Sequence, residues 1–531
     1  MKKLVTMILA MMLLCTSMIP AMAENTDPYG KYAEPVTITI LSEDFKTGTT
    51  NYDSTNPERK SASENAWIDA YKDFLNIEVK RNIAEDETAL NAKISTSLAS
   101  GDLPDVIICS KEMATMLIEN EVVQDLYPAL NGYEQSNYLA SCLDDAMFTF
   151  GIVDGKMLAF PITNNWYNGT QLLWVRQDWL DKIGKEVPKT IDELVDVARA
   201  IRDAKLGGED TIGFGMMNDK SYYDFRGILA AYGAVYDTWQ KGEDGVYEYG
   251  CVADEMKPGL LKLQEMYQEG LLAPDFGTMT TKIIAETIAN GRCGMYYATG
   301  WHSVTDLKTN MVNDPEAVWV CVPIPTLDGE RVKQYTNGSA SKFVLVTEGC
   351  EHPEAIFKMM ELEQKEYMNP TPELMTTLYA AEDDFLMWDL RVFRDFGRTD
   401  FDLYRSKLIN EHLAAGHTSE VVEPVILDFY QQIERALAGD RSLLGRYICQ
   451  ANAYPIDAEL LAGGWLCPEY GGELTENMML YEETLYADLN AAMVKVIMGE
   501  DISVFEKAVD AWYANGGQAI TDEVNAYYNG K

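Results

Sequence analysis

Residue types that enzymes use for catalysis occur in this chain without the partners they need. Ser339 and Lys342 have the spacing of an acylating serine and its base, but the companion Ser-Asp-Asn and Lys-Thr-Gly motifs are absent. Gly-x-Ser-x-Gly, a Walker phosphate loop and His-Glu-x-x-His are absent too. His412 and His417 fit no common zinc-ligand spacing, and no EF-hand calcium loop occurs. These patterns indicate a protein that is not an enzyme and that carries no metal or cofactor.

Bulk composition limits the classes of partner. The 531-residue chain is 47% hydrophobic and 11% aromatic. This apolar content supports more than one core, so we expect at least two lobes and little disorder. The formal net charge is −41. Such a charge excludes a nucleic-acid partner, which requires a basic surface, and it opposes adhesion to anionic membranes.

The amino terminus has the pattern of a secretory signal peptide. Lys2 and Lys3 precede an apolar run over 4–14, and Ala21-Met22-Ala23 provides a small-x-small cleavage site. We therefore expect residues 1–23 to be removed and the mature protein to be exported. No later stretch approaches the ~18 apolar residues that a membrane span requires.

The cysteines after the signal peptide favour free thiols. They are widely scattered from Cys109 to Cys467, without a Cys-x-x-Cys pair. A chain of this size does not depend on disulfides for its core, so we expect most of these thiols to be buried and unpaired. Cys109 and Cys321 both lie in predicted apolar strands.

Residues 36–111 alternate between strand and helix patterns. The predicted elements are strands at 36–41, 77–83 and 106–109, and helices over 63–75 and from Asp86 to Ser100. This order is typical of a parallel sheet covered by helices. Loops at the carboxyl ends of such strands line ligand clefts. The loops that begin at Ser42-Glu43-Asp44 and at Ser110-Lys111 are therefore expected at a cleft.

Residues 151–193 carry the local signals of a scaffold. Asp154-Gly155 predicts a hairpin turn, and Gln177 and Gly184 bound a predicted helix. Thr190 with Glu193 three residues later is a capping box. It opens a helix whose apolar residues recur at helical spacing, so that one face is buried.

The rest of the chain predicts a second α/β unit. The expected strands are 171–175, 212–216, 293–298, 318–324 and 341–347. A hairpin is expected around Asp244-Gly245, and a helix over 256–269. From His352 onward the pattern is mostly helical.

Seven segments along the chain resemble bacterial extracellular solute-binding proteins of the carbohydrate ABC-importer type, in the large branch of about this length. They are ISTSLASGDLPDVII (94–108), DGKMLAFP (154–161), RQDWLDKIGKEVPKTIDEL (176–194), LQEMYQEGLLAPDF (263–276), IANGRCGMYY (288–297), HPEAIFKMM (352–360) and the ending at 497–528. Each segment is specific to the fold rather than to a ligand.

The resemblance implies a two-lobed α/β protein. The expected architecture is the periplasmic-binding-protein-like fold of type II, with hinge strands and a helical carboxyl-terminal region. The N-lobe would hold 36–163, with 285–340 returning to it. The C-lobe would hold 164–284 and continue through 341–531.

The same resemblance implies a function. A monomer would capture a sugar or oligosaccharide between its lobes and deliver it to the membrane permease of an ABC importer. Members in Gram-positive cells are usually lipoproteins with a small residue before the lipidated cysteine. Here Leu14 precedes Cys15, so the fit is poor, and the site after Ala23 favours simple secretion to the extracellular face of the envelope.

Sugar-binding sites combine aromatic faces with polar hydrogen-bonding groups. Trp166 lies among asparagines that include Asn165, at the expected crossing between lobes. Trp301 follows the strand predicted at 293–298, at its carboxyl end, where ligand loops lie. Each tryptophan is a candidate for stacking on a ligand, and a place in the core is the alternative for each.

Three further candidates have weaker signals. Asp44 follows the first predicted strand, and a solvated loop is its alternative. Trp239 precedes the expected hairpin, and Tyr335 lies in a polar loop. Structural roles compete with ligand binding at both positions.

Two other functions stay open at the level of sequence. A secreted glycoside hydrolase would need two carboxylates at a defined separation across a cleft, and the 84 acidic residues supply many candidate pairs. A binding protein for a non-sugar solute such as a peptide would have a charged or backbone-reading groove in place of stacked aromatic rings.

Overall fold

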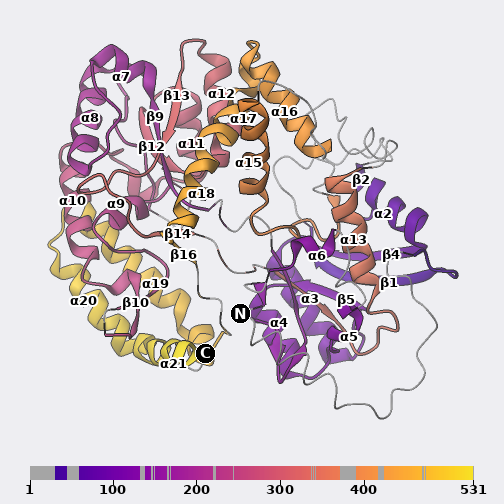
Figure 1. Ribbon diagram of the computed structural model, residues 1–531. Coiled ribbons are helices and arrows are strands. Elements are labelled where there is room, and N and C mark those ends of the chain that lie inside the picture. The colour runs from indigo at the N-terminus through magenta and orange to yellow at the C-terminus, as the bar shows by residue number, and fades with distance from the viewer. Residues whose placement is uncertain are drawn as a thin grey trace.

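The computed structural model describes residues 30–529 of the chain, except 45–58, 132–137, 145–146, 149, 164–166, 168, 219–222, 243, 337, 339, 341, 371–389, 416–423, 469, 471 and 473. Two lobes are visible, each built around its own sheet (Figure 1). The predicted signal peptide, Cys15, Trp166 and Asn165 lie outside the described residues.

The N-lobe contains a five-stranded sheet in the order β4-β1-β5-β15-β8. Its strands are β1 Val36–Glu43, β4 Ile77–Ala84, β5 Val106–Cys109, β8 Phe160–Ile162 and β15 Lys342–Val346. β4, β1 and β5 are mutually parallel, whereas β15 is antiparallel to both β5 and β8. The predicted strand–helix–strand order of the first segment is confirmed.

Helices cover both faces of this sheet. They are α2 Ala66–Ala70, α3 Glu87–Ser100, α4 Lys111–Glu119, α5 Tyr127–Leu130, α6 Leu139–Cys142 and α13 Ala355–Met368, with the π-helical turn η1 Tyr71–Leu75. Two small hairpins are added, β2 Arg59–Ser61 with β3 Glu64–Asn65 and β6 Ile152–Val153 with β7 Lys156–Met157. α3 begins as expected, because the Asp86 carboxylate accepts a hydrogen bond from the Ala89 N–H at 2.8 Å.

The C-lobe contains a three-stranded antiparallel sheet with β9 at its centre. Its strands are β9 Leu172–Arg176, β12 Met295–Ala298 and β13 Trp319–Val322. Two further strand pairs are β10 Trp239–Lys241 with β11 Tyr247–Tyr249, and β14 Gln334–Thr336 with β16 Leu466–Pro468. All five residues of β9 are buried, so this strand forms the middle of the C-lobe core.

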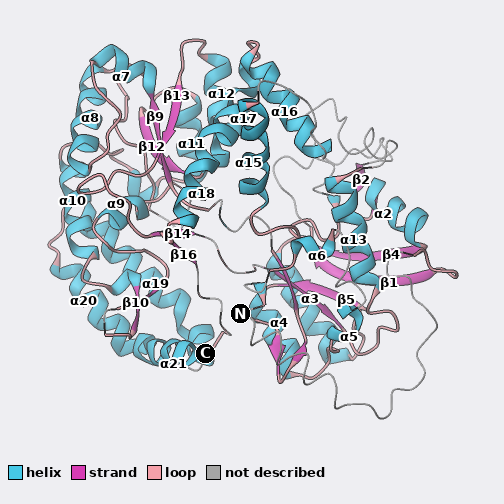
Figure 2. Cartoon of the chain, in the orientation of Figure 1, coloured by secondary structure: helices cyan, strands magenta, loops and turns pink. Residues whose placement is uncertain are grey.

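Helices surround the C-lobe sheet (Figure 2). They are α7 Gln177–Ile183, α8 Ile191–Ala204, α9 Arg226–Ala231, α10 Met256–Gln268, α11 Thr281–Ala289, α12 Asp306–Asn313, α19 Glu476–Ile497, α20 Ser503–Trp512 and α21 Gln518–Asn529. The predicted capping box is confirmed, since the Thr190 hydroxyl accepts from the Glu193 N–H and the Glu193 carboxylate accepts from the Thr190 N–H. α8 buries the apolar face that its spacing predicts.

The strand expected at 212–216 does not form. Ile212 and Gly215 make only isolated bridges, to Cys293 and Tyr296. The segment passes very close to α8, and a Cβ at Gly213 would lie 2.3 Å from the Ala198 carbonyl oxygen. Glycine permits this approach, but it leaves no side chain to pack on a pleated surface.

The expected division of the chain between the lobes needs correction. Residues 285–340 were expected in the N-lobe, yet β12 and β13 both pair with β9 in the C-lobe. Residues 341–531 were expected in the C-lobe, yet β15 pairs with β5 and β8, and α13 packs on the N-lobe core. The cause is strand pairing between distant segments, which local patterns do not encode.

The chain therefore crosses between the lobes three times, near 163–171, 336–342 and 396–401. The first and third crossings touch, because the Gly397 N–H donates to the Thr163 carbonyl at 2.8 Å. Crossings that lie together give the two lobes a shared pivot.

A helical group follows the third crossing, in agreement with the helical pattern predicted for this part. It comprises α15 Phe401–Ala414, α16 Pro424–Leu437, α17 Leu444–Ile448 and α18 Tyr454–Ala462. Its small core consists of Phe401, Ile409, Ile426, Phe429 and Ile433. The group is fixed to the C-lobe by Arg441, which donates to the carbonyls of Met311 and Ala317, each at 2.8 Å.

All eight cysteines in the described part of the chain are free, and seven of them are buried. The prediction of buried, unpaired thiols is thus confirmed. Within the same residues, no helix has the length and apolar character needed to cross a membrane.

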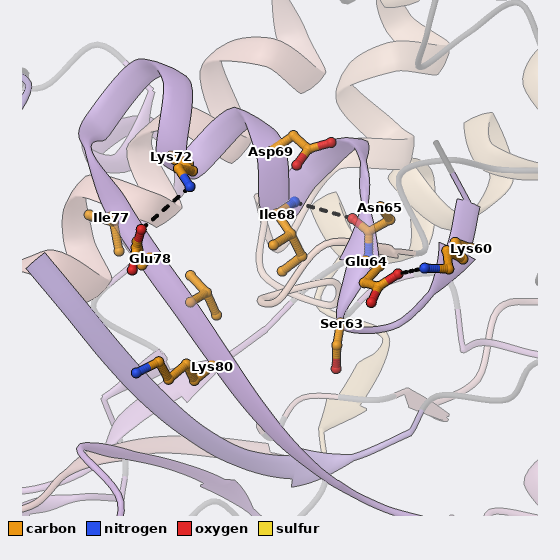
Figure 3. Close-up of a pocket in the computed structure, with 11 residues that line it drawn as sticks. Lys60, Ser63, Glu64, Asn65, Ile68, Asp69, Lys72, Ile77, Glu78 and Lys80 are labelled. Atoms are coloured by element: carbon orange, nitrogen blue, oxygen red, sulfur yellow. Dashed lines mark hydrogen bonds and ion pairs between the residues drawn. The ribbon is translucent and has the colours of Figure 1, made fainter. Parts of the chain in front are cut away.

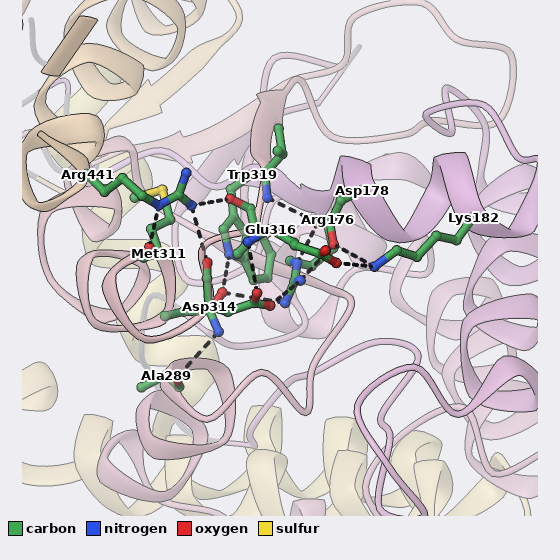
Figure 4. A network of polar contacts seen from close by, with 12 residues as sticks. Arg176, Asp178, Lys182, Ala289, Met311, Asp314, Glu316, Trp319 and Arg441 are labelled. Atoms are coloured by element: carbon green, nitrogen blue, oxygen red, sulfur yellow. Dashed lines mark hydrogen bonds and ion pairs between the residues drawn. The ribbon is translucent and has the colours of Figure 1, made fainter. Parts of the chain in front are cut away.

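A buried arginine joins the elements at the outer end of β9 (Figure 4). Arg176 is 1% exposed and donates to Asp178 at 2.7 Å and to Asp314 at 2.9 Å. Its guanidinium also lies over the rings of Trp179 and Trp319, at 4.7 and 5.7 Å. One side chain thus connects the end of β9 with α7, β13 and the loop after α12.

Replacing this arginine tests its structural role. Arg176→Met should lower the free energy of unfolding by roughly 3 kcal/mol, because the Asp178 side chain is only 10% exposed and would lose the cation that it contacts at 2.7 Å. Lys182→Met is the matched control, since Lys182 is 49% exposed beside the same carboxylate and should contribute less than about 1 kcal/mol. Urea denaturation measures both changes. Equal losses in the two variants would contradict the assignment.

Candidate functional site

The candidate site lies where the two sheets meet the crossing segments. In the N-lobe, the carboxyl ends of β1 and β5 and the start of β15 share one edge, since Phe343 pairs with Cys109. In the C-lobe, the start of β9 and the end of β12 share one edge, since Ala298 pairs with Leu172. The first crossing joins these two edges, because it runs from the end of β8 to the start of β9. We call them the hinge edges.

Polar groups of both charges occupy the N-lobe hinge edge. Glu43 at the end of β1 accepts from Lys342 at the start of β15, at 2.5 Å. The hydroxyls of Ser110 and Thr163 are buried and have no hydrogen-bond partner among the described residues. Asp44 is half-buried, and its backbone N–H donates to the Ala84 carbonyl at 2.8 Å. This edge thus offers hydroxyl, carboxylate and ammonium groups within a few residues.

The C-lobe hinge edge carries a buried group of three polar side chains. The Gln171 amide donates to Asp224 Oδ1 at 2.9 Å, and its oxygen accepts from the Gly227 N–H at 2.8 Å. Arg226 Nε donates to Asp224 Oδ2 at 2.8 Å. Burial acts to lower the pKa of the Arg226 guanidinium, but the ion pair with Asp224 outweighs it and the net shift is upward. The guanidinium therefore stays charged.

Tyr335 covers this group from the neighbouring strand β14. Its ring centre lies 4.4 Å from the Arg226 guanidinium carbon. Together with Gln171 these residues line a very small hollow, with a cavity volume of about 10 Å³. Gly227 forms part of its wall. A larger residue would not fit there, because a Cβ would lie 2.7 Å from the Tyr297 ring. The hollow lies directly beside the second crossing, which begins where β14 ends.

Trp301 lies at the same edge, just after β12. It belongs to the 3₁₀ turn η7 Gly300–Val304 and is half-buried. Its ring stacks on His302 with centroids 3.9 Å apart. The His302 ring is buried, Nδ1 lies 2.8 Å from the Thr299 hydroxyl, and burial lowers the pKa of the imidazole to about 3. A neutral imidazole thus supports the tryptophan from one side.

The residues predicted from sequence are distributed over several places. Tyr335 and Trp301 lie at the C-lobe hinge edge, and Asp44 lies at the N-lobe hinge edge. Trp239 lies elsewhere, on the β10–β11 hairpin, where it packs 5.3 Å from Tyr249, and Tyr249 in turn stacks on Trp512. Structural packing explains Trp239 without a ligand.

Gln171, Asp224 and Arg226 were not anticipated. Gln171 comes from a crossing, and Asp224 and Arg226 come from the start of α9 and the residues just before it, more than fifty residues further on. Neither stretch has a motif, so only the fold brings these side chains together. Lys342 was considered only as part of a chance Ser-x-x-Lys match.

A much larger hollow lies away from the hinge edges. It has a volume of about 540 Å³ and follows β4 on the outer side of the N-lobe (Figure 3). Lysines and carboxylates line it, including an ion pair between Lys72 and Glu78 at 3.4 Å. A second hollow of about 500 Å³ adjoins Arg176 at the outer end of β9. Both lie away from the crossings, so volume alone does not identify the site.

Residues 55–362, more than half of the chain, match the model of the bacterial extracellular solute-binding protein family. The chain belongs to this family. Similar proteins include a polygalacturonan/rhamnogalacturonan-binding protein of Bacillus subtilis, 24% identical over 38% of this chain and 41% of that protein. A fructooligosaccharide ABC transporter substrate-binding protein of Streptococcus pneumoniae is 26% identical over 34% of this chain and 36% of that protein. The chain thus spans less than half of the length of these two relatives.

Solved structures agree in fold over nearly the whole chain. An alginate-binding protein has a TM-score of 0.58 and 13% identity, covering 94% of this chain and 99% of that one. An HMO-binding, ABC-transporter-associated solute-binding protein of Bifidobacterium longum infantis has a TM-score of 0.59 and 16% identity, with the same coverage. The two-lobed fold implied by the resemblance is therefore confirmed.

The buried imidazole beneath Trp301 predicts a pH-dependent stability. The pKa of His302 is about 3 in the folded chain, against an ordinary value of 6.5, so only the unfolded chain takes up this proton as the pH falls below 6.5. The contribution of the neutral His302 to the free energy of unfolding is complete above pH 6.5. It is lost as the pH falls toward 3, by at most ~1.4 kcal/mol per pH unit.

Urea unfolding between pH 7 and pH 5 checks this slope. His302→Gln should reduce the loss of stability over that interval. His352→Gln should leave it nearly unchanged, because the His352 side chain is 43% exposed. An unaltered slope in His302→Gln would show that another group governs the acid response.

Proposed function

We propose that this protein captures a sugar or oligosaccharide between its lobes and delivers it to the membrane permease of an ABC importer, without chemical turnover. Family membership carries the proposal, because the family consists of extracellular solute-binding proteins. The relatives support the ligand class, since one is named for binding polygalacturonan and rhamnogalacturonan and the other for fructooligosaccharide. The hinge edges supply the chemistry that such ligands require.

Each type of group at the hinge edges has a role in this proposal. The half-buried face of Trp301 would stack on the apolar face of a sugar ring. The carboxylates of Asp44 and Glu43 would accept hydrogen bonds from sugar hydroxyls, and Arg226 would donate to them. The hydroxyls of Ser110 and Thr163 have no hydrogen-bond partner within the described part of the chain, and a hydroxylated ligand could pair with them. Trp166 and Asn165 belong to the first crossing and stay candidates.

Closure of the lobes would couple these groups. A ligand that touches both hinge edges interacts more favourably when the lobes are together, so it shifts the equilibrium toward the closed arrangement. Rotation about the shared pivot would exclude water from the ligand. Release to a permease then requires the lobes to separate again.

The arrangement of carboxylates favours binding over hydrolysis. Glu43 and Asp224 are acidic groups at the two hinge edges, and each forms an ion pair, Glu43 with Lys342 and Asp224 with Arg226. A glycoside hydrolase needs one carboxylic acid that donates a proton to the leaving group. Ion-paired carboxylates serve better as hydrogen-bond acceptors.

We also propose that the protein is exported and cleaved after Ala23. The lysine-led apolar amino terminus supports this proposal, as does the extracellular character of the family. Mass spectrometry of the secreted protein should find Glu24 at the amino terminus. A lipid-modified amino terminus at Cys15 would overturn it.

Ligand binding can be tested by thermal shift and calorimetry against a panel of oligosaccharides that includes galacturonans, fructans and chitooligosaccharides. A true ligand raises the melting temperature, because it binds only the folded chain. Chromatography of the same mixtures tests turnover. Shorter sugars formed in proportion to the protein would overturn the binding-only proposal, and the absence of any stabilising glycan would contradict the ligand class.

Trp301→Ala should weaken the binding of that ligand about tenfold or more, because loss of the stacked ring removes apolar contact worth ~1.5 kcal/mol. Leu480→Ala is a suitable control, since Leu480 is 60% exposed on α19, an element that contributes nothing to the hinge edges. Equal affinity in the wild type and Trp301→Ala would remove Trp301 from the site.

A further inference from the structure

The two lobes touch at a point outside the three crossings. Lys111 is the first residue of α4 and follows β5 at the N-lobe hinge edge. Its ammonium donates a hydrogen bond to the backbone carbonyl of Gly472 in the C-lobe. The same ammonium lies between two aromatic rings, 5.3 Å from the centre of Phe150 and 5.5 Å from that of Tyr470. We call these four residues the interlobe contact.

The N-lobe half of this contact is fixed to its core. Phe150 is buried and packs edge-to-face on Phe343 of β15, with ring centroids 4.6 Å apart. Lys111 begins a helix whose Ala114 and Leu117 are buried in the same apolar cluster. The backbone of Lys111 therefore stays with the N-lobe if the lobes rotate apart.

The C-lobe half is fixed equally well. The Tyr470 ring packs on Tyr527 and Tyr528 of α21, with centroids at 5.2 and 6.0 Å. Tyr528 stacks in parallel on Tyr247 of β11, at 4.0 Å. A row of tyrosines therefore connects the interlobe contact to the carboxyl-terminal helix and to the β10–β11 hairpin. In Figure 1, α4 lies on the side of the N-lobe that faces α21.

We propose that the arrangement of the lobes described above is the closed one, and that the interlobe contact is a latch that favours it before any ligand binds. Hinge rotation would separate Lys111 from both Gly472 and Tyr470, because Lys111 belongs to the N-lobe and both partners belong to the C-lobe. A charge-assisted hydrogen bond and a cation–π contact would then be lost together. The latch thus opposes opening without touching the ligand.

The effect of the latch on ligand affinity rests on the proposed function, whereas the contact between the lobes does not. A ligand that binds only the closed arrangement has an apparent affinity proportional to the closed fraction. The latch raises that fraction, so it would tighten binding of every ligand equally. A residue that contacts the ligand would instead distinguish among sugars.

The decisive experiment measures the ligand-free protein. Lys111→Met keeps the length of the side chain and removes the charge, and it should increase the radius of gyration measured by small-angle X-ray scattering. Tyr470→Leu should produce a similar opening, and the double variant should open no further than either alone. Lys72→Met is the matched control, because Lys72 is 62% exposed on the outer side of the N-lobe, and it should change nothing.

Ligand titrations add a second readout. Lys111→Met should weaken every ligand by the same factor, roughly three- to thirtyfold. Loss of affinity with an unchanged ligand-free radius of gyration would overturn the latch and make Lys111 a ligand contact. An unchanged radius in both Lys111→Met and Tyr470→Leu would overturn it as well. Failure of all sugars to bind would contradict the proposed function and leave the scattering test of the latch intact.

Discussion

The arrangement of the lobes depends on the backbone pairing of β15. A strand that has just crossed from one lobe must satisfy its N–H and C=O groups within the other. β15 does so on both sides, with Phe343 opposite Cys109 of β5 and Pro161 of β8. This pairing places the crossing at the edge where β1 and β5 end. The polar loops of the N-lobe are therefore held beside the pivot, and the location of the candidate site follows from the pairing.

The net negative charge of the protein does not describe its interior, where cations pair with carboxylates. The chain has a net charge of −41, yet some of its 43 lysines and arginines occupy internal positions. Arg176 joins the outer end of the C-lobe sheet, Arg226 organises its hinge edge, and Lys342 pairs with Glu43 across the N-lobe sheet. Each of these three cations pairs with a carboxylate of its own lobe.

Sequence patterns predicted features that depend on neighbouring residues. The Asp86 cap, the Asp154-Gly155 turn and the Thr190–Glu193 capping box all form as expected, because their hydrogen bonds close within a few residues. Features set by distant pairing were predicted poorly. The exchange of 285–340 and 341–396 between the lobes and the missing strand at 212–216 both depend on what packs against a segment. The candidate site shows the same limit. Trp301 and Tyr335 could be proposed from their residue type alone. Gln171, Asp224 and Arg226 could be identified only from the fold, which brings them together.

The free cysteines have a consequence for how the protein matures. Burial raises the pKa of Cys142, Cys293 and Cys449 to about 12, so these sulfurs remain protonated and react slowly with oxidants. The described core closes by apolar packing and strand pairing, without a covalent bond between distant segments. Closure of the described core thus requires neither an oxidase nor a disulfide isomerase.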